Sequence, residues 1–258
     1  MSITDLQKNI IKEFGSDVTQ KKYLTKALDG LWNSEKILIP EFFIPGSTVL
    51  DIGCGTGRTT IPFYKLWYRI LGVDLVPEMI KNAQKIAQEK KLAIEYEIGD
   101  ATALKYPDNG FDNAIFSSNW FGQIPSKQKR QKALDEIYRV IKPDGYFILV
   151  AHARAQRDFS FFWIKSFVRI YILKRLGMNI EEVDFGDYIF HRHIDGVELK
   201  QTQFMHIANQ GEIKNQLELA GFTIIFAKRE NEITDQDLND QDNVYNHPPV
   251  FFVCKKIG

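Results

Sequence analysis

Short apolar runs alternate with longer stretches of helical periodicity through most of this chain. The runs fall at about 48–52, 69–73, 94–98, 113–117 and 146–151, and they predict buried strands. Segments of helical character lie between them, and strands that alternate with helices are typical of a parallel sheet. The pattern therefore predicts a doubly wound α/β fold with helices on both faces of the sheet.

Proline and serine mark where the intervening helices begin. We expect helices at about 58–67, 77–90 and 126–141. Pro77 stands at a first helical position, where its fixed φ is favourable and its missing N–H costs nothing. Ser126 can cap the third of these helices with its side-chain oxygen.

The alternation of strands and helices breaks after the fifth strand. It resumes with a helix at 211–220 and strands at 223–228 and 250–255. Residues 152–208 are therefore expected to be an insertion. Such a lid would lie over the carboxyl ends of the strands, where ligands bind in open α/β sheets.

The composition fits one large domain that has no global preference for a polyanion. The chain has 258 residues, and its 33 basic and 33 acidic residues cancel. Residues 1–46 are expected to form an N-terminal helical cap on a single domain, 1–258. Two well-separated cysteines, with no recognisable signal peptide and no long apolar stretch, favour a cytoplasmic protein without a transmembrane segment.

The first predicted strand ends in a glycine-rich loop at 51–57, with the sequence DIGCGTG. Glycine accepts positive φ and lets a ligand approach the backbone, and the following helix presents N–H groups at its N-terminus. A dinucleotide fingerprint would read G-x-G-x-x-G, but Arg58 occupies its sixth position. The spacing therefore argues against a nicotinamide-dependent oxidoreductase.

The D-x-G-x-G-x-G pattern at 51–57 resembles motif I of the class I S-adenosylmethionine-dependent methyltransferases. The segment 140–145, VIKPDG, is similar to the element that precedes the fifth strand in that family, with Asp144 in place of its usual first glycine. The resemblance implies a seven-stranded, mostly parallel sheet with an antiparallel last strand. It also implies S-adenosylmethionine as the cofactor and methyl transfer as the reaction.

Acidic residues follow the second and third strands, where they can recognise an adenosine. Asp74 can accept hydrogen bonds from ribose hydroxyls, and Asp100 from the adenine amino group. Ala101 offers an N–H to the ring, Met79 can pack on the purine, and Asp51 can hold the ammonium of a methionine moiety directly or through water. Each of these residues, taken alone, could have a purely structural role, but their order and spacing along the chain together favour a cofactor site. The predicted cofactor-binding residues are Asp51, Gly53, Cys54, Gly55, Gly57, Asp74, Leu75, Met79, Asp100, Ala101, Ser117 and Asn119.

The insertion opens with a basic and aromatic stretch at 154–175. Its apolar residues recur with helical spacing, and lysine and arginine occupy the opposite face. We expect a lid helix that packs its apolar face on the domain, with contact to a membrane surface or an RNA backbone as alternatives. The apolar face consists of Phe161, Ile164, Val168, Tyr171 and Ile172. A hairpin is predicted further on, around Asp195-Gly196.

Histidine is the natural general base near neutral pH, and His191, His193 and His206 lie in the insertion. His206 is predicted as the catalytic base because the chain re-enters the sheet there, and His191 is the second candidate. No acidic residue or cysteine accompanies these histidines at a convincing ligand spacing, so no metal site is expected.

Three functions are compatible with these features. The leading hypothesis is a methyltransferase for a small-molecule acceptor, because the chain is neutral and carries a lid. The second is a tRNA or other RNA methyltransferase that uses the basic stretch 154–175. The third is a protein that binds S-adenosylmethionine without turnover.

Overall fold

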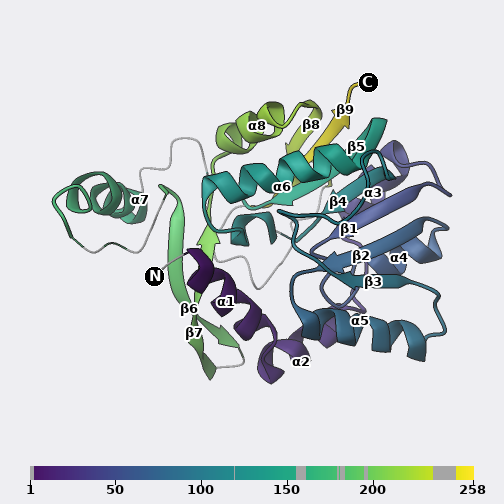
Figure 1. Cartoon of the computed structure of the whole chain (residues 1–258), viewed down its shortest axis with the longest axis horizontal. Helices are drawn as coiled ribbons and strands as arrows, with labels where there is room; N and C mark the ends of the chain where they lie inside the picture. Colours follow the sequence, from purple (N-terminus) through teal and green to yellow (C-terminus); the bar gives the residue numbers. More distant parts are fainter. Residues whose placement is uncertain are drawn as a thin grey trace.

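A seven-stranded sheet forms the centre of the chain in the computed structural model (Figure 1). The structure describes residues 3–118, 120–154, 161–178, 180, 184–194, 197–234 and 248–258. The strand order is β3-β2-β1-β4-β5-β9-β8. The strands of this sheet are β1 (Thr48–Ile52), β2 (Arg69–Asp74), β3 (Glu95–Ile98), β4 (Phe111–Phe116), β5 (Ile141–Ala151), β8 (Phe222–Arg229) and β9 (Val250–Lys256).

The direction of the strands places the ligand-binding edge. Strands β1 to β5 run parallel to one another, whereas β9 runs antiparallel to both β5 and β8. The doubly wound, mostly parallel sheet with an antiparallel last strand is therefore confirmed. Parallel strands end at the same edge, so the residues that follow β1, β2 and β3 come together there.

Side chains alternate across the sheet and form a core on each face. Leu50 faces the cluster that contains residues of α6 and α8, while its neighbour Val49 faces the cluster formed with α3 and α4. Burial on both faces explains why the strands read as continuous apolar runs. The helices that flank the sheet are α3 (Asn33–Phe42), α4 (Thr60–Lys65), α5 (Pro77–Glu89), α6 (Lys127–Val140) and α8 (Gln210–Leu219).

The largest differences from the predicted boundaries concern one helix and one strand. The helix expected at 58–67 spans only Thr60–Lys65, because Gly57 has a φ of +99° before it and Trp67 has a φ of +66° after it. The fifth strand begins at Ile141 rather than 146, since Ile141 pairs with Phe111 ahead of a register shift. Neither difference moves the carboxyl ends of the strands.

A second layer of structure covers the ligand edge of the sheet. Helix α1 (Ile3–Phe14) is followed by α2 (Asp17–Lys26), and β6 (Asp187–Ile194) pairs antiparallel with β7 (Val197–His206). Leu6 and Ile10 of α1 share a buried cluster with Phe204 of β7, and Figure 1 shows α1 beside this hairpin. The predicted hairpin is confirmed, while its turn at Asp195-Gly196 lies outside the described residues.

The helix of the insertion does not pack as expected. In Figure 1, α7 (Phe161–Phe167) stands apart from the sheet, and it continues as the π-helical turn η2 (Val168–Leu173). Trp163 is buried against Phe185, so the Trp163 side faces inward. Ile164 and Tyr171 remain about half exposed. The prediction that their apolar face packs on the domain is therefore wrong.

Candidate functional site

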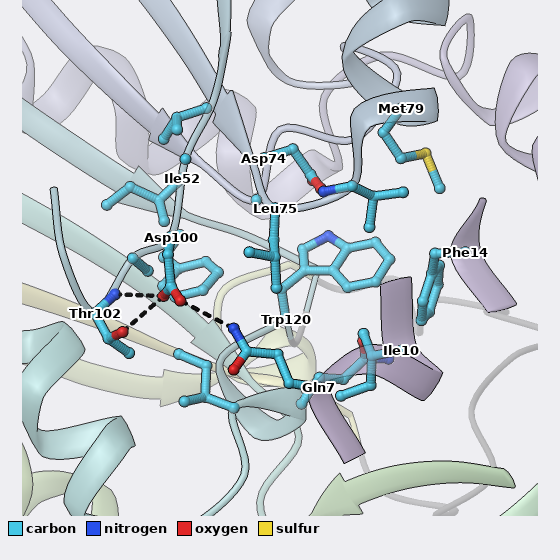
Figure 2. Close-up of a pocket in the computed structure, with 18 of the residues that line it drawn as sticks. Gln7, Ile10, Phe14, Ile52, Asp74, Leu75, Met79, Asp100, Thr102 and Trp120 are labelled. Carbon is cyan, nitrogen blue, oxygen red and sulfur yellow. Dashed lines mark hydrogen bonds between the residues drawn. The ribbon is translucent and has the colours of Figure 1, made fainter. Parts of the chain in front are cut away.

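A pocket opens at the carboxyl ends of β1, β2 and β3, beneath α1 (Figure 2). Its volume is about 740 Å³, including the part open to solvent. The strand ends contribute Gly53, Asp74 and Asp100, and most of the remaining wall is apolar. The pocket thus lies where the topology of an open α/β sheet places a ligand.

Asp74 ends β2 and points into this pocket. Its Oδ2 accepts a hydrogen bond from the Gly55 amide at 2.9 Å, and its Oδ1 accepts one from the Val76 amide at 2.8 Å. Burial raises the pKa of Asp74 to about 6, so the carboxylate is ionised at neutral pH. Each oxygen of a carboxylate can accept two hydrogen bonds, which leaves both oxygens able to accept one from a ligand hydroxyl.

Asp100 follows β3 and ties α1 to the opposite wall of the pocket. Its Oδ1 accepts hydrogen bonds from the Thr102 amide and hydroxyl, both at 2.8 Å. Its Oδ2 accepts a hydrogen bond from Gln7 Nε2 of α1 at 2.9 Å, and the dashed lines in Figure 2 mark these contacts. Gln7 Oε1 in turn accepts a hydrogen bond from Lys129 Nζ at 2.8 Å. A polar bridge therefore joins α1, β3 and α6 across the pocket.

The glycine loop is shaped for close approach at Gly53. This residue has a φ of +64°, and a Cβ atom there would lie 3.0 Å from the Phe116 ring and 3.1 Å from the Trp120 indole. Glycine is required both by the left-handed backbone and by this contact. Three other loop amides are engaged within the protein: Cys54 N donates to Val73 O, Gly55 N to Asp74 and Gly57 N to Cys54 O.

Asp51 lies behind the pocket rather than in its wall. The carboxylate is buried, and its Oδ2 accepts hydrogen bonds from the hydroxyls of Thr59 and Thr60 at 2.5 and 2.6 Å. Burial raises the pKa of Asp51 to about 6, against the opposing effect of the two hydroxyls. This arrangement fixes the start of α4 and does not support direct contact between Asp51 and a ligand ammonium.

Arg58, which replaces the third dinucleotide glycine, anchors the loop to α3. Its two terminal nitrogens lie 2.8 Å from the two carboxylate oxygens of Glu35, a fully buried side chain. Arg58 also donates to the hydroxyls of Ser117 and Ser118. Bidentate pairing of this kind is geometrically specific. Ser117 therefore belongs to a buried network beside the pocket, not to its wall.

The structure brings half of the predicted cofactor residues into the pocket wall. Cys54, Gly55 and Gly57 shape the loop from behind, as do Asp51 and Ser117. Asn119 lies outside the described residues. The predicted residues that line the pocket are Gly53, Asp74, Leu75, Met79, Asp100 and Ala101.

The sequence interpretation missed the contribution of α1 to the pocket. Ile10 and Phe14 of α1 line the pocket, and the Phe14 and Trp120 rings meet edge to face with centroids 4.9 Å apart. Trp120, which follows the fourth strand, also lines the pocket and is absent from the predicted cofactor-binding residues. The i, i+4 spacing of Leu6, Ile10 and Phe14 indicates a buried helix face, yet it carries no information on what that face covers.

The two histidines predicted as bases do not line the pocket. His206 is buried, with Nδ1 2.8 Å from Asp187 and Nε2 2.9 Å from Glu212. Buried Arg130 lies 3.8 Å from the same Glu212 carboxylate. His191 is exposed on β6. Because both ring nitrogens of His206 are occupied, its geometry supports a structural role rather than proton transfer.

The donor and acceptor pattern of the pocket fits the adenosine half of S-adenosylmethionine. A purine ring is flat and apolar on its faces, and Leu75, Met79 and Ile52 supply apolar walls. Ribose hydroxyls and an exocyclic amino group are donors, and Asp74 and Asp100 are the two acidic residues among the described lining residues. No group of three or more potential metal ligands occurs in the part of the chain that the structure describes.

Comparisons with known proteins point to the same chemistry. Residues 49–145 match the family model described as a methyltransferase domain. An uncharacterised methyltransferase, YcgJ of Bacillus subtilis, is 36% identical over 107 residues, which cover 40% of each chain. Phosphoethanolamine N-methyltransferase 3 of Arabidopsis thaliana is 27% identical over 177 residues, covering 62% of this chain and 35% of that protein. The matched parts thus span well under half of these curated relatives.

Solved structures support the fold over nearly the whole chain. A SAM-dependent methyltransferase from Methanosarcina mazei superposes with a TM-score of 0.68 at 20% identity, covering 88% of this chain and 99% of that one. The 1,6-didemethyltoxoflavin-N1-methyltransferase of Burkholderia thailandensis, solved with S-adenosylhomocysteine, gives a TM-score of 0.66 at 16% identity and covers 100% and 92%. At these identities the likeness shows the fold.

Proposed function

We propose that this chain, which carries a methyltransferase domain of the class I S-adenosylmethionine-dependent family, transfers a methyl group to a small-molecule acceptor. The observation that carries the proposal is the pair of carboxylates, Asp74 and Asp100, at the ends of adjacent parallel strands beside Gly53. S-adenosylmethionine supplies an electrophilic methyl group on a sulfonium.

Each pocket residue has a distinct part in holding the cofactor. Asp74 accepts the ribose hydroxyls while its two backbone partners hold the carboxylate in place. Asp100 accepts the adenine amino group, and Leu75 and Met79 pack on the purine faces. Asp100 also accepts a hydrogen bond from Gln7 of α1, so the same side chain couples adenine binding to the position of α1.

The protein contributes orientation and exclusion of water rather than an evident base. Among the described residues that line the pocket, the titratable ones are Asp74, Asp100 and Lys129. The two carboxylates are assigned to the cofactor, and Lys129 Nζ donates to Gln7. Holding donor and acceptor in a near-attack geometry supplies a large part of the rate enhancement in such reactions. An acceptor with an uncharged or readily ionised nucleophile suits this site.

Two observations support a small acceptor. The roof of the pocket is formed by Phe14 and Trp120, which favour a flat or apolar molecule over a polyanion backbone. The named relatives include enzymes for phosphoethanolamine and for 2-methyl-6-phytyl-1,4-hydroquinone, and a structural neighbour is named for didemethyltoxoflavin. Those names describe the relatives; for this chain they suggest the acceptor classes to test first.

The test is methyl transfer from S-adenosylmethionine labelled with deuterium in the methyl group. The protein is incubated with phospho-amines, hydroquinones, nitrogen heterocycles and total RNA, and mass spectrometry follows S-adenosylhomocysteine and labelled product. Labelled product with a small molecule supports the proposal. Labelling of RNA alone favours an RNA methyltransferase. Binding of S-adenosylhomocysteine without any turnover favours a protein that binds S-adenosylmethionine without catalysis.

A further inference from the structure

The insertion helix presents an apolar outer side that nothing in the described structure covers. Its inner side holds Trp163, which packs on Phe185 with ring centroids 5.9 Å apart. The Arg154 guanidinium lies over both rings, 5.2 and 4.8 Å from their centroids. Phe167 and Tyr171 also approach Phe185, with ring centroids 6.3 and 6.2 Å away. The outer side is made of aliphatic residues that stay exposed, Ile164, Ile172 and Leu176. In Figure 1, the helix stands apart from the sheet.

Large apolar side chains are exposed along the whole segment 161–178. Six of them, in α7, η2 and the turn that follows, have exposed fractions between 46% and 74%: Ile164, Phe167, Tyr171, Ile172, Leu176 and Met178. At roughly 100 Å² each, half-exposed side chains of this size make a patch of several hundred Å². Exposed apolar area of this extent matches the largest patch of a typical monomer, which is often functional. A helix that is apolar on both sides is expected to be covered on both.

The charged residues of the same segment all have one sign. Residues 161–178 contain Lys165, Arg169, Lys174 and Arg175, and no aspartate or glutamate. Lys165, Lys174 and Arg175 are exposed, so their charges lie at the border of the apolar patch. The chain as a whole is neutral, and the acidic residues Glu181, Glu182 and Asp184 follow in the sequence, so the positive charge is confined to the segment 161–178. Long basic side chains around an apolar centre suit a surface that is apolar inside and anionic at its border.

We propose that the segment 161–178 docks on an anionic lipid surface, lying in the headgroup region with Ile164, Ile172 and Leu176 toward the acyl chains. The helical part comprises the 7 residues of α7 and the 6 of η2, far fewer than the ~20 residues that a spanning helix requires. Among the residues that the structure describes, no helix combines the length and apolarity needed to cross a bilayer. The helix therefore lies on the membrane rather than across it.

An RNA backbone is a weaker match to this surface. RNA contact would need the cations and aromatic rings to form the exposed face, yet Ile164, Ile172 and Leu176 make up much of it. Aliphatic side chains gain nothing from phosphates or bases, whereas they gain by leaving water for acyl chains. The combination of aliphatic exposure with positive charge thus favours a lipid.

The experiment is co-sedimentation of the full chain with vesicles of phosphatidylcholine, with and without phosphatidylglycerol. We expect binding to the anionic vesicles that is at least ~10-fold stronger than to pure phosphatidylcholine and that weakens with added salt. The triple variant Ile164→Ser, Ile172→Ser, Leu176→Ser should lose at least ~10-fold in affinity, since each residue removes buried apolar area. The variant Trp67→Ser is the matched control, because Trp67 is 84% exposed and follows α4.

A second pair of variants tests the charges separately. Lys165→Glu with Lys174→Glu should abolish the preference for phosphatidylglycerol. The control, Lys85→Glu in α5 with Lys90→Glu at its C-cap, should leave that preference intact. Circular dichroism and melting curves check that all variants are folded. Failure of the wild-type chain to bind either vesicle overturns the proposal. The proposal is also overturned if the triple variant binds vesicles as tightly as the wild-type chain. A third contradicting result is a wild-type chain that forms a concentration-dependent dimer without binding vesicles, when the triple variant abolishes that dimer. None of these readouts depends on methyl transfer.

Discussion

Replacing Asp74 by asparagine tests the assignment of the ribose site with almost no change in side-chain volume. The carboxylate accepts the Gly55 amide through one oxygen and the Val76 amide through the other. In asparagine one of these positions becomes an NH2 group, which faces a backbone N–H and cannot accept from it. The variant therefore loses the charge that would receive the ribose hydroxyls, and it also leaves one loop amide without its acceptor.

The expected loss of affinity follows from the two hydroxyls. Hydrogen bonds to a charged group contribute ~1.5–3 kcal/mol and neutral ones ~0.5–1.5 kcal/mol. A difference of ~1 kcal/mol for each hydroxyl gives ~2 kcal/mol, or roughly a 30-fold rise in the Kd for S-adenosylhomocysteine. The orphaned amide costs a further ~1–3 kcal/mol in the free energy of unfolding. Isothermal titration calorimetry and thermal denaturation measure the two effects separately.

A matched control separates binding from stability. Asp112 stands at the start of β4, on the opposite edge of the sheet, and accepts hydrogen bonds from Thr48 and Lys142. Asp112→Asn should lower the melting temperature and leave the Kd for S-adenosylhomocysteine unchanged. If Asp74→Asn binds S-adenosylhomocysteine within about twofold of the wild-type chain, the assignment of the ribose site is refuted.

The raised pKa of Asp74 adds a pH dependence with a definite sign. Burial moves this pKa from 3.8 to about 6, so the carboxylate takes up a proton as the pH falls through 6. Affinity for S-adenosylhomocysteine should be full above pH 6 and fall by up to ~10-fold per pH unit below it. The unliganded fold should respond in the opposite sense: the folded state binds the extra proton, so its stability declines as the pH rises from about 4 to 6. Asp74→Asn should remove the pH dependence of binding.

Three further substitutions test other parts of the account. Gly53→Ala should lower the free energy of unfolding by ~1–3 kcal/mol and abolish detectable cofactor binding in calorimetry. The control is Gly46→Ala, because Gly46 has a φ of +87° and no atom within 4 Å of an added Cβ, so this variant should show only the backbone strain. His206→Ala should lower the melting temperature, because it removes the buried contact between His206 Nδ1 and Asp187 Oδ1, while kcat per folded molecule stays within a few-fold. A loss of ~1,000-fold in kcat would restore His206 as a base. Glu35→Gln should lower the free energy of unfolding, measured by denaturant titration, by ~3–5 kcal/mol, because it removes the charged partner of Arg58.

The sheet could be predicted from sequence because its signals are local. Each strand is a short apolar run, each parallel connection contains a helix, and the turn residues lie between them. Asp74 and Asp100 could be placed at one edge for the same reason: the strand direction alone decides where each strand end lies. The errors in the helix at 58–67 and in the start of β5 arose at loops where positive φ and a register shift override the pattern.

The contacts that complete the site join residues far apart in sequence. Arg58 pairs with Glu35, 23 residues away, and Gln7 reaches Asp100 across 93 residues. No periodicity in either segment specifies such a partner. The same limit explains why His206 was predicted as a base. Its position near the sheet could be predicted from sequence, but its partners Asp187 and Glu212 could not. Its burial between two carboxylates, rather than its residue type, decides its role.

A crystal structure of the chain with S-adenosylhomocysteine tests the central claim most directly. We expect the ribose hydroxyls on the Asp74 carboxylate, the adenine between Leu75 and Met79 with its amino group toward Asp100, and the sulfur on the side of Gly53 and Trp120. Density for the ligand elsewhere on the chain, or a pocket that stays free of ligand at saturating S-adenosylhomocysteine, would contradict it.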